Sequence, residues 1–209
     1  MKPSLDPEQA LRAVPVPESL PDIGPAAARD GLLDVAYVID DSPVGRLLLA
    51  ATPRGLVRLA YLDHSDEDAV LEHLASHVSP RVLSAAKPLD EPRRELEQYF
   101  SGGRREFDTP LDWQLVHGFG RRVLEATARV PFGSVTTYKR MATEAGSPRA
   151  ARAAGNALGA NPIPIIVPCH RVLHSTGGLG GYTGGLDRKR LLLGIEGSSP
   201  AEQLTLQNS

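Results

Sequence analysis

The stretch Asn161-Pro-Ile-Pro-Ile-Ile-Val-Pro-Cys-His-Arg-Val172 contains Cys169, the one cysteine of this 209-residue chain. A thiol is a strong nucleophile near neutral pH only as its thiolate, so neighbouring groups decide whether it reacts. Here the imidazole of His170 and the guanidinium of Arg171 follow directly. The apolar run at 165–167 predicts a buried strand that leads into the site. A lone cysteine can equally be a small buried hydrophobe, and this stretch by itself leaves both readings open.

Composition limits the classes of protein to which the chain can belong. With 41% hydrophobic and 5% aromatic residues, it is globular and long enough for one large or two small domains. A single cysteine excludes an internal disulfide, which agrees with a reducing compartment, and we expect a cytoplasmic protein. The sequence has no run of 18 or more apolar residues that could span a membrane. Its first 29 residues also lack the apolar segment of a secretory signal.

The net charge of −2 hides an uneven distribution. Residues 1–112 carry 12 basic and 20 acidic side chains, whereas residues 113–197 carry 11 basic and 4 acidic ones. The net charge is therefore −8 for residues 1–112 and +7 for residues 113–197, and Cys169 lies in this second, basic half. Such asymmetry predicts a polyanionic partner for that half. A solvated, arginine-rich surface without a partner is the alternative.

The acidic half predicts an α/β domain at residues 31–112, after a tail at 1–30 that contains six prolines and is expected to be disordered. A helix capped by Ser65 should follow the strands, and a second helix is expected at about 91–100. We identify no functional site in this domain and interpret it as a scaffold. Short apolar runs between turns predict three strands, at 35–39, 45–50 and 56–61.

The basic half predicts a mostly helical domain at residues 113–197, followed by a tail at 198–209. Its short helices at Tyr138–Glu144 and Pro148–Leu158, the second capped by Ser147, form a helix-turn-helix pattern. The second helix has almost no bulky side chain apart from its arginines. It would let the backbone approach the minor groove of DNA closely. An alanine-rich core helix is the alternative, although an arginine among the alanines argues against full burial.

Together with Gly181-Tyr-Thr-Gly-Gly-Leu186, the stretch at 161–172 closely resembles the active-site motif of the O6-alkylguanine-DNA alkyltransferases. These are the methylated-DNA–protein-cysteine methyltransferases. The resemblance extends from near Phe119 to Gly197, with a looser likeness from near Leu33 to Asp112. It implies a small ribonuclease-H-like sheet with helices, followed by a mostly helical domain that binds DNA and transfers the alkyl group.

The resemblance implies a DNA-repair protein whose partner is double-stranded DNA containing O6-alkylguanine, with O4-alkylthymine as a second candidate substrate. The target base must leave the stack before its alkyl group can be attacked. The implied reaction is a single transfer to Cys169 that consumes the protein. We expect no cofactor and no metal, no membrane association, and a monomer.

The resemblance also implies roles for four catalytic residues. Cys169 is the nucleophile, His170 deprotonates it through a water molecule, and Glu196 holds the imidazole in the useful tautomer. Asn161 braces the turn between the recognition helix and the active-site strand.

The remaining implied roles concern binding. Arg152 fills the space that the flipped base leaves, and Tyr138 crowds the phosphate and reaches the base with its hydroxyl. Tyr182 lies along the alkyl group, the Thr183 amide faces O6, and glycines at 177–185 allow a close wall. Backbone groups of Cys169 and Val172 complete the pocket. Contacts to DNA or substrate are thus implied for Tyr138, Ala151, Arg152, Arg171, Val172, Tyr182 and Thr183.

The sequence leaves two rival functions open. A non-catalytic alkyltransferase-like lesion binder would use the same fold, but such proteins lack the cysteine that Cys169 supplies here. A cysteine hydrolase or redox enzyme would explain Cys169 and His170. It would leave Arg152 and the +7 charge of the basic half unexplained.

Overall fold

Three hydrophobic runs form an antiparallel meander, and a short fourth strand completes the sheet. The computed structural model describes residues 33–198, so the tails predicted at 1–30 and 198–209 lie outside the described residues, apart from Ser198. The strands are β1 (Val35–Asp40), β2 (Leu47–Thr52), β3 (Gly55–Tyr61) and β4 (Val82–Ser84). Their order is β3-β2-β1-β4, with β4 parallel to β1 and the other neighbours antiparallel. The three expected strands are confirmed, whereas the three-residue β4 is too short to reveal itself by pattern.

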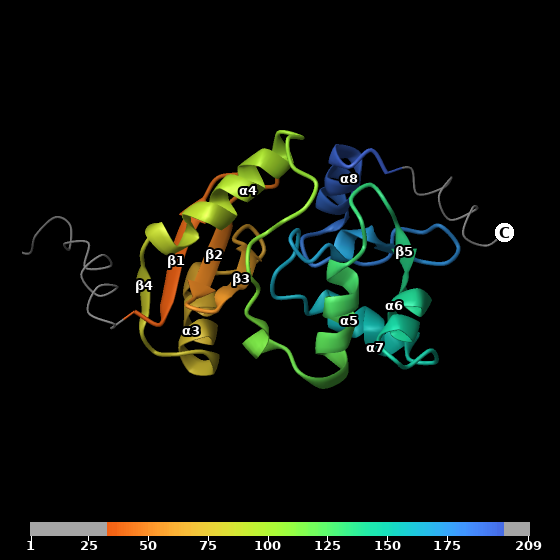
Figure 1. Ribbon diagram of the computed structural model, residues 1–209, viewed down its shortest axis with the longest axis horizontal. Helices are drawn as coiled ribbons and strands as arrows, with labels where there is room; N and C mark the ends of the chain where they lie inside the picture. The colour runs from red at the N-terminus through yellow and green to blue at the C-terminus, as the bar shows by residue number, and fades with distance from the viewer. Residues whose placement is uncertain (1–32, 199–209) are drawn as a thin grey trace, which may run out of the picture.

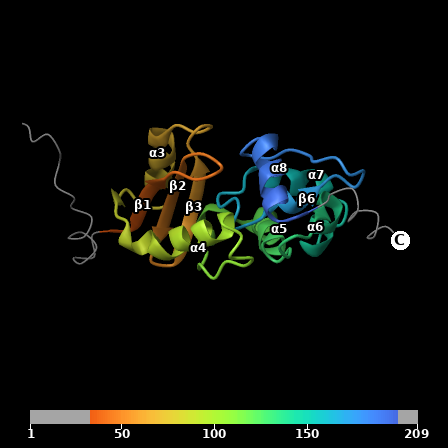
Figure 2. The same ribbon diagram turned by 90° about the horizontal axis from the view of Figure 1, so that it is seen from above.

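Two helices cover opposite faces of this sheet, namely α3 (Glu67–His77) and α4 (Asp90–Phe100). On one face Leu48 of β2 shares a cluster with Leu74 of α3. On the other face Leu49 shares a cluster with Leu96 of α4. Figure 2 shows the sheet between the two helices. The alternation of side chains along a strand therefore supplies both faces with apolar contacts.

The predicted cap at Ser65 is wrong by one residue. Asp66 is the N-cap of α3, with extended backbone angles and no capping hydrogen bond from its side chain. Glu67 and Asp68 instead place negative charge in the first turn. The helix dipole favours negative charge there, so electrostatics and not a hydroxyl cap stabilises this end.

A mostly helical part follows the sheet and confirms the expected fold class. Its elements are α5 (Gly118–Ala128), β5 (Thr136–Thr137), α6 (Tyr138–Glu144), α7 (Ala151–Gly159), β6 (Val172–Leu173) and α8 (Leu186–Ile195). Figure 1 shows the two parts side by side. One apolar cluster joins them, because Tyr99 of α4, Leu124 of α5 and Ile165 all belong to it. Among residues 33–198, no helix is long and apolar enough to cross a membrane.

The second helix of the helix-turn-helix begins later than predicted. Ala150, not Ser147, is the N-cap of α7, and residues 148–149 form a turn. The backbone N–H of Ala150 donates to the Ser147 carbonyl at 2.9 Å, which closes that turn. Pro148 thus lies in the turn between the helices and not in the first turn of α7.

The strand predicted at 165–167 is also wrong, although all three of its residues are buried. The segment is a series of turns, in which Val167 N–H donates to the Ile163 carbonyl at 2.9 Å. Ile165 adopts a positive φ of 74°, which no strand residue has. Prolines at 162, 164 and 168 lack backbone donors, so a strand here would have an incomplete ladder. Hydrophobicity predicted the burial of this segment and misled about its conformation.

Candidate active site

Cys169 follows the turns after α7 and is the first residue of η3 (Cys169–Arg171), a single 3-10 turn. Its side chain is buried, and Asn161 Nδ2 lies 3.2 Å from its sulfur. Burial raises the pKa of Cys169 to about 11, although the Asn161 contact and the nearby charge of Lys189 act in the opposite direction. The thiol is therefore protonated at neutral pH and needs a base before it can attack.

His170 has the hydrogen-bonding pattern of a neutral base. It is fully buried, and its Nε2 lies 2.8 Å from Glu196 Oε1. An ionised carboxylate can only accept, so Nε2 carries the hydrogen and Nδ1 has a free lone pair. Nδ1 is buried and has no hydrogen-bond partner among residues 33–198. Burial lowers the pKa of His170 and outweighs the opposing effect of Glu196, which keeps the imidazole neutral and able to accept a proton.

Glu196, the C-cap of α8, is the centre of a buried polar cluster. Its carboxylate also accepts from Tyr99 Oη at 2.7 Å and from two guanidinium nitrogens of Arg171 at 2.9 Å each. Burial alone would raise the pKa of Glu196, but the hydrogen bonds from His170 and Arg171 outweigh it and lower the pKa to about 2. The carboxylate is thus charged and fixed beside His170 at all ordinary pH values.

The role implied for Arg171 as a DNA contact needs correction. Its side chain is buried, with its donors on Glu196 and on the Val130 carbonyl. A guanidinium committed to a buried carboxylate is not available to a phosphate on the surface. The Arg171 side chain therefore holds Glu196 inside the protein.

A cavity of about 660 Å³ opens beside the thiol. The small side chains of α7 form part of its lining, and Tyr138, at the start of α6, contributes a ring. Gly180, with φ +68°, has no Cβ, and this allows the Tyr138 hydroxyl to lie directly against the loop. Six residues predicted from the sequence line this cavity together: Tyr138, Ala151, Arg152, Cys169, Tyr182 and Thr183.

Two other predicted residues, Val172 and Asn161, lie away from the cavity lining. Val172 is fully buried and is not among the residues lining the cavity; its carbonyl accepts from Lys189 Nζ at 2.7 Å. Asn161 donates to the Val167 carbonyl at 2.8 Å and accepts from Ile163 N–H at 3.0 Å, so it holds the turns that precede the thiol. Arg152 is exposed at the cavity, and its charge has no ion-pair partner among residues 33–198.

Sequence reasoning missed three buried polar residues around the site. Lys189 is fully buried within α8 and donates to carbonyls of β6 and of the glycine-rich loop, and burial lowers its pKa to about 8. Tyr99 reaches Glu196 from α4, and Tyr61 reaches Tyr182 from β3 with 2.7 Å between the two hydroxyls. No local pattern marks these residues as buried, because lysines are mostly exposed and tyrosines are found both inside and at the surface.

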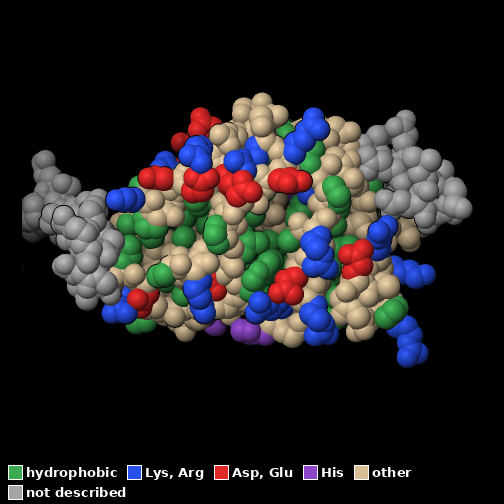
Figure 3. Space-filling model, viewed as in Figure 1, with side chains coloured by type: hydrophobic (Ala, Val, Ile, Leu, Met, Phe, Trp, Pro, Cys, Tyr) green, Lys and Arg blue, Asp and Glu red, His purple; other side chains and the backbone are tan. Residues whose placement is uncertain are grey.

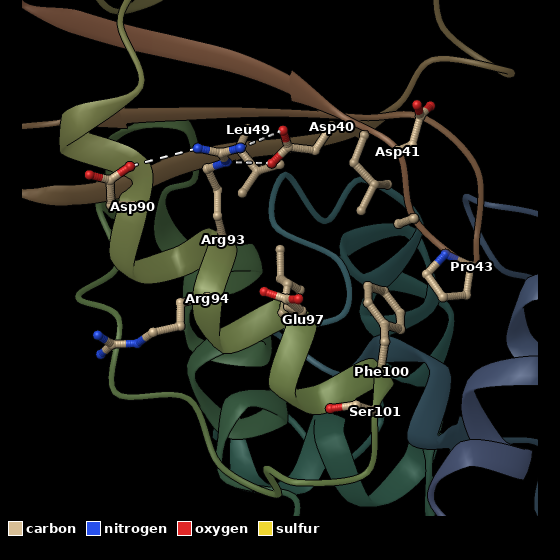
Figure 4. A pocket seen from close by; sticks show the side chains of 13 residues that line it. Asp40, Asp41, Pro43, Leu49, Asp90, Arg93, Arg94, Glu97, Phe100 and Ser101 are labelled. Carbon is tan, nitrogen blue, oxygen red and sulfur yellow. Dashed lines mark hydrogen bonds and ion pairs between the residues drawn. The ribbon is translucent and has the colours of Figure 1, made fainter.

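A second cavity, of about 710 Å³, lies in the α/β part (Figure 4). Arg93 of α4 pairs there with Asp40 at 2.6 Å and with Asp90 at 3.7 Å. No nucleophilic thiol or imidazole lines it. Within residues 33–198, no group of three or more His, Cys, Asp or Glu side chains is placed to hold a metal ion. The chemistry of the described residues is therefore concentrated at Cys169.

Comparison with known proteins identifies the family. The family model described as "6-O-methylguanine DNA methyltransferase, DNA binding domain" matches residues 118–198, and the one described as its "ribonuclease-like domain" matches residues 35–113. The methylated-DNA–protein-cysteine methyltransferase of Mycobacterium tuberculosis is 40% identical over 172 residues, which is 82% of this chain and 98% of the relative. The protein of the same name from Methanosarcina barkeri is 41% identical over 160 residues, 77% of this chain and 96% of the relative.

A solved structure shows the same arrangement of domains. The crystal structure of Mycobacterium tuberculosis OGT in complex with DNA has a TM-score of 0.66 and 36% identity, covering 81% of this chain and 99% of that one. With two family models and close relatives matched over most of its length, the chain belongs to the methylated-DNA–protein-cysteine methyltransferase family.

Proposed function

We propose that the protein repairs double-stranded DNA by moving an alkyl group from O6 of guanine to Cys169, in one transfer per molecule. O4-alkylthymine is a second candidate substrate. The observation that carries this proposal is the buried, hydrogen-bonded pair of Glu196 and His170, the neighbour of Cys169 in the chain, together with a cavity that Cys169 lines and that can receive a base. The neutral imidazole with its free Nδ1 supplies the base that the protonated thiol requires.

The proposed step balances without a cofactor. His170 accepts the thiol proton through a water molecule, and the thiolate attacks the alkyl carbon. The new S–C bond forms as the C–O6 bond breaks, and the electron pair stays on the base. A proton returns to the guanine, so the products are S-alkyl cysteine and unmodified guanine. The thioether has no good leaving group, and the chain has no second cysteine to release it.

The target base must first leave the DNA stack. Arg152 is exposed on α7 at the rim of the cavity, where its planar head can fill the gap in the duplex. Tyr138, Tyr182 and Thr183 line the same cavity, and in this proposal Tyr138 crowds the phosphate of the flipped nucleotide while Tyr182 and Thr183 border the alkyl group. Residues 113–197 thus form the DNA-binding and transfer domain, and residues 31–112 form its scaffold, in a monomer that acts in the cytoplasm.

Mass spectrometry tests the reaction directly. Incubation with a duplex containing O6-methylguanine should replace the thiol hydrogen of Cys169 by a methyl group, which adds the mass of one methylene to its peptide, and repair should stop at one alkyl group per protein molecule. Cys169→Ala should abolish transfer and still bind DNA, because its arginines are intact. A lesion binder without chemistry would bind the duplex and form no adduct. Sustained turnover, or an adduct on another residue, would contradict the proposal.

Changing Arg152→Ala tests base flipping. The variant should lose far more activity on the duplex than on free O6-benzylguanine, because a free base is already unstacked. Equal losses on the two substrates would assign Arg152 to the fold or the pocket.

A further inference from the structure

The α/β part reaches the active site through Tyr61, the last residue of β3. Its side chain is buried, and its hydroxyl lies 2.7 Å from the hydroxyl of Tyr182. The two rings meet edge to face, with centroids 6.2 Å apart and planes at 64°. The distance and the edge-to-face geometry are those of a specific hydrogen-bonded aromatic pair.

Tyr182 is the residue of this pair that faces the chemistry. It lines the cavity together with Cys169, and its ring stands perpendicular to that of His170, with centroids 6.3 Å apart. Its position therefore sets how much space an alkyl group has next to the sulfur. The hydrogen bond between the two hydroxyls restricts the Tyr182 ring, because rotation of that ring would leave both part-buried hydroxyls without this partner.

Arg188 of α8 fixes Tyr61 in turn. Its guanidinium lies 4.8 Å from the centre of the Tyr61 ring, within the range of a cation–π contact. The same guanidinium binds the Asp63 carboxylate and the Val44 carbonyl in the α/β part, and the Gly184 carbonyl at 3.0 Å in the loop. Arg188 thus contacts both the α/β part, which carries Tyr61, and the loop that carries Tyr182.

Gly184 shows how closely this contact is built. A Cβ at this position would lie 2.6 Å from Tyr61 and 3.0 Å from Tyr182, closer than side chains can pack. A side chain at this position would therefore force one of the two rings to move. In addition, Leu59 N–H of β3 donates to the Pro162 carbonyl at 2.8 Å, so the same strand also holds the turns before the thiol.

We propose that Tyr61 is a positioning residue that holds Tyr182 next to Cys169 and thereby restricts the size of the alkyl group that is transferred quickly. This inference rests on the proposed transfer to Cys169. It gives the α/β part, which the sequence suggests is only a scaffold, a role in choosing the substrate. Without the hydrogen bond between Tyr61 and Tyr182, the Tyr182 ring has more freedom to move aside for a bulky group.

The test compares Tyr61→Phe with the wild type on two duplexes of identical sequence, one with O6-methylguanine and one with O6-benzylguanine. Single-turnover rate constants for adduct formation on Cys169 are measured for both. The variant keeps the ring and loses one hydrogen bond, so the benzyl-to-methyl rate ratio should rise about two- to tenfold. Tyr37→Phe, in β1 of the same sheet and away from the cavity, is the matched control and should leave the ratio unchanged.

Two further variants make the result decisive. Tyr182→Phe should shift the ratio in the same direction. The double variant Tyr61→Phe/Tyr182→Phe should show little further change, because both substitutions remove the same hydrogen bond. Gly184→Ala should raise the ratio by separating the rings. An unchanged ratio for Tyr61→Phe, with or without lower thermal stability, overturns the inference. Failure of the wild type to form an adduct from either duplex instead contradicts the proposed function.

Discussion

At the scale of single residues, Glu196 connects His170, the proposed base, to both parts of the molecule. It accepts from His170, from Arg171 and from Tyr99, which comes from α4 of the α/β part. A buried carboxylate is stable only when its oxygens are satisfied in this way. The cluster therefore keeps Glu196 charged and holds the neutral His170 with its hydrogen on Nε2, so that Nδ1 is free to accept a proton.

The acid stability of the fold should depend on Glu196. Its pKa is about 2 in the folded protein, against an ordinary value of 4.5, so the unfolded chain binds more protons between these values. The resulting stability is complete above pH 4.5 and is lost as the pH falls toward 2, by about 3 kcal/mol. Urea unfolding from pH 6 to pH 2.5 measures this loss. Glu196→Gln should be less stable at pH 6 and show a shallower decline, and parallel declines would contradict the assignment.

The rate of transfer should also report on His170. Because burial lowers the pKa of His170, the imidazole stays neutral below its ordinary pKa of 6.5 and remains able to accept a proton there. We expect the single-turnover rate on saturating O6-methylguanine duplex to stay constant from pH 8 to 6.5 and to fall only at lower pH. A decline centred above 6.5 would show that a different or more exposed group is the base.

At the scale of elements, α7 and the glycine-rich loop shape the cavity by leaving space. Gly155 of α7 would place a Cβ at ordinary contact distance from the Tyr138 ring, whereas Gly180 would place one against the Tyr138 hydroxyl. The two segments therefore hold Tyr138 between them. The absence of a side chain is thus a requirement of the site and of the backbone at Gly180, whereas a Cβ would fit at Gly155.

Gly180→Ala should displace Tyr138 and slow transfer from duplex DNA roughly tenfold or more, because small misplacements of binding groups reduce rates steeply. The matched control is Gly102→Ala after α4, which has a similar positive φ of 78° and no atom within 4 Å of the added Cβ. Both variants bear the strain of a positive φ, about 1 kcal/mol. Thermal unfolding should therefore show similar losses, while only Gly180→Ala loses activity. Equal rates for the two variants would show that Tyr138 adjusts without consequence.

At the scale of the whole molecule, charge is separated along the chain. Figure 3 shows acidic side chains gathered over α4 and basic ones projecting from the end that holds α6 and α7. The sequence totals of −8 for residues 1–112 and +7 for residues 113–197 agree with this view. A polyanion should therefore approach the helical end, where the cavity opens beside α7.

DNA binding should accordingly be salt-dependent and insensitive to sequence. The logarithm of the affinity should fall linearly with the logarithm of salt concentration, and Arg149→Ala, an exposed position just before α7, should reduce the slope by about one. Arg81→Ala in the α/β part, where Arg81 pairs with Asp34, should leave the slope unchanged. Fluorescence anisotropy on two unrelated duplexes measures this. Equal slopes for the two variants, or a strong preference for one duplex, would contradict the assignment of binding to the helical part.

The sequence by itself determined the elements and the chemical groups of the site. Apolar runs between turns predicted β1 to β3, helical patterns predicted α3 and α4, and the family resemblance named six of the residues that line the cavity. These are local properties, because strand and helix periods and side-chain chemistry are read within a few residues. The boundaries were less certain, as the caps of α3 and α7 show.

Only the tertiary structure decided which groups meet across long distances in the chain. The prolines and the positive φ of Ile165 turned an apparent strand into turns, and packing buried Arg171 on Glu196 instead of leaving it for DNA. The contact of Tyr61 with Tyr182 joins residues 121 positions apart, and no local pattern encodes it. Burial and pairing depend on how separate segments pack, so the roles of these buried polar side chains were set by the fold as a whole.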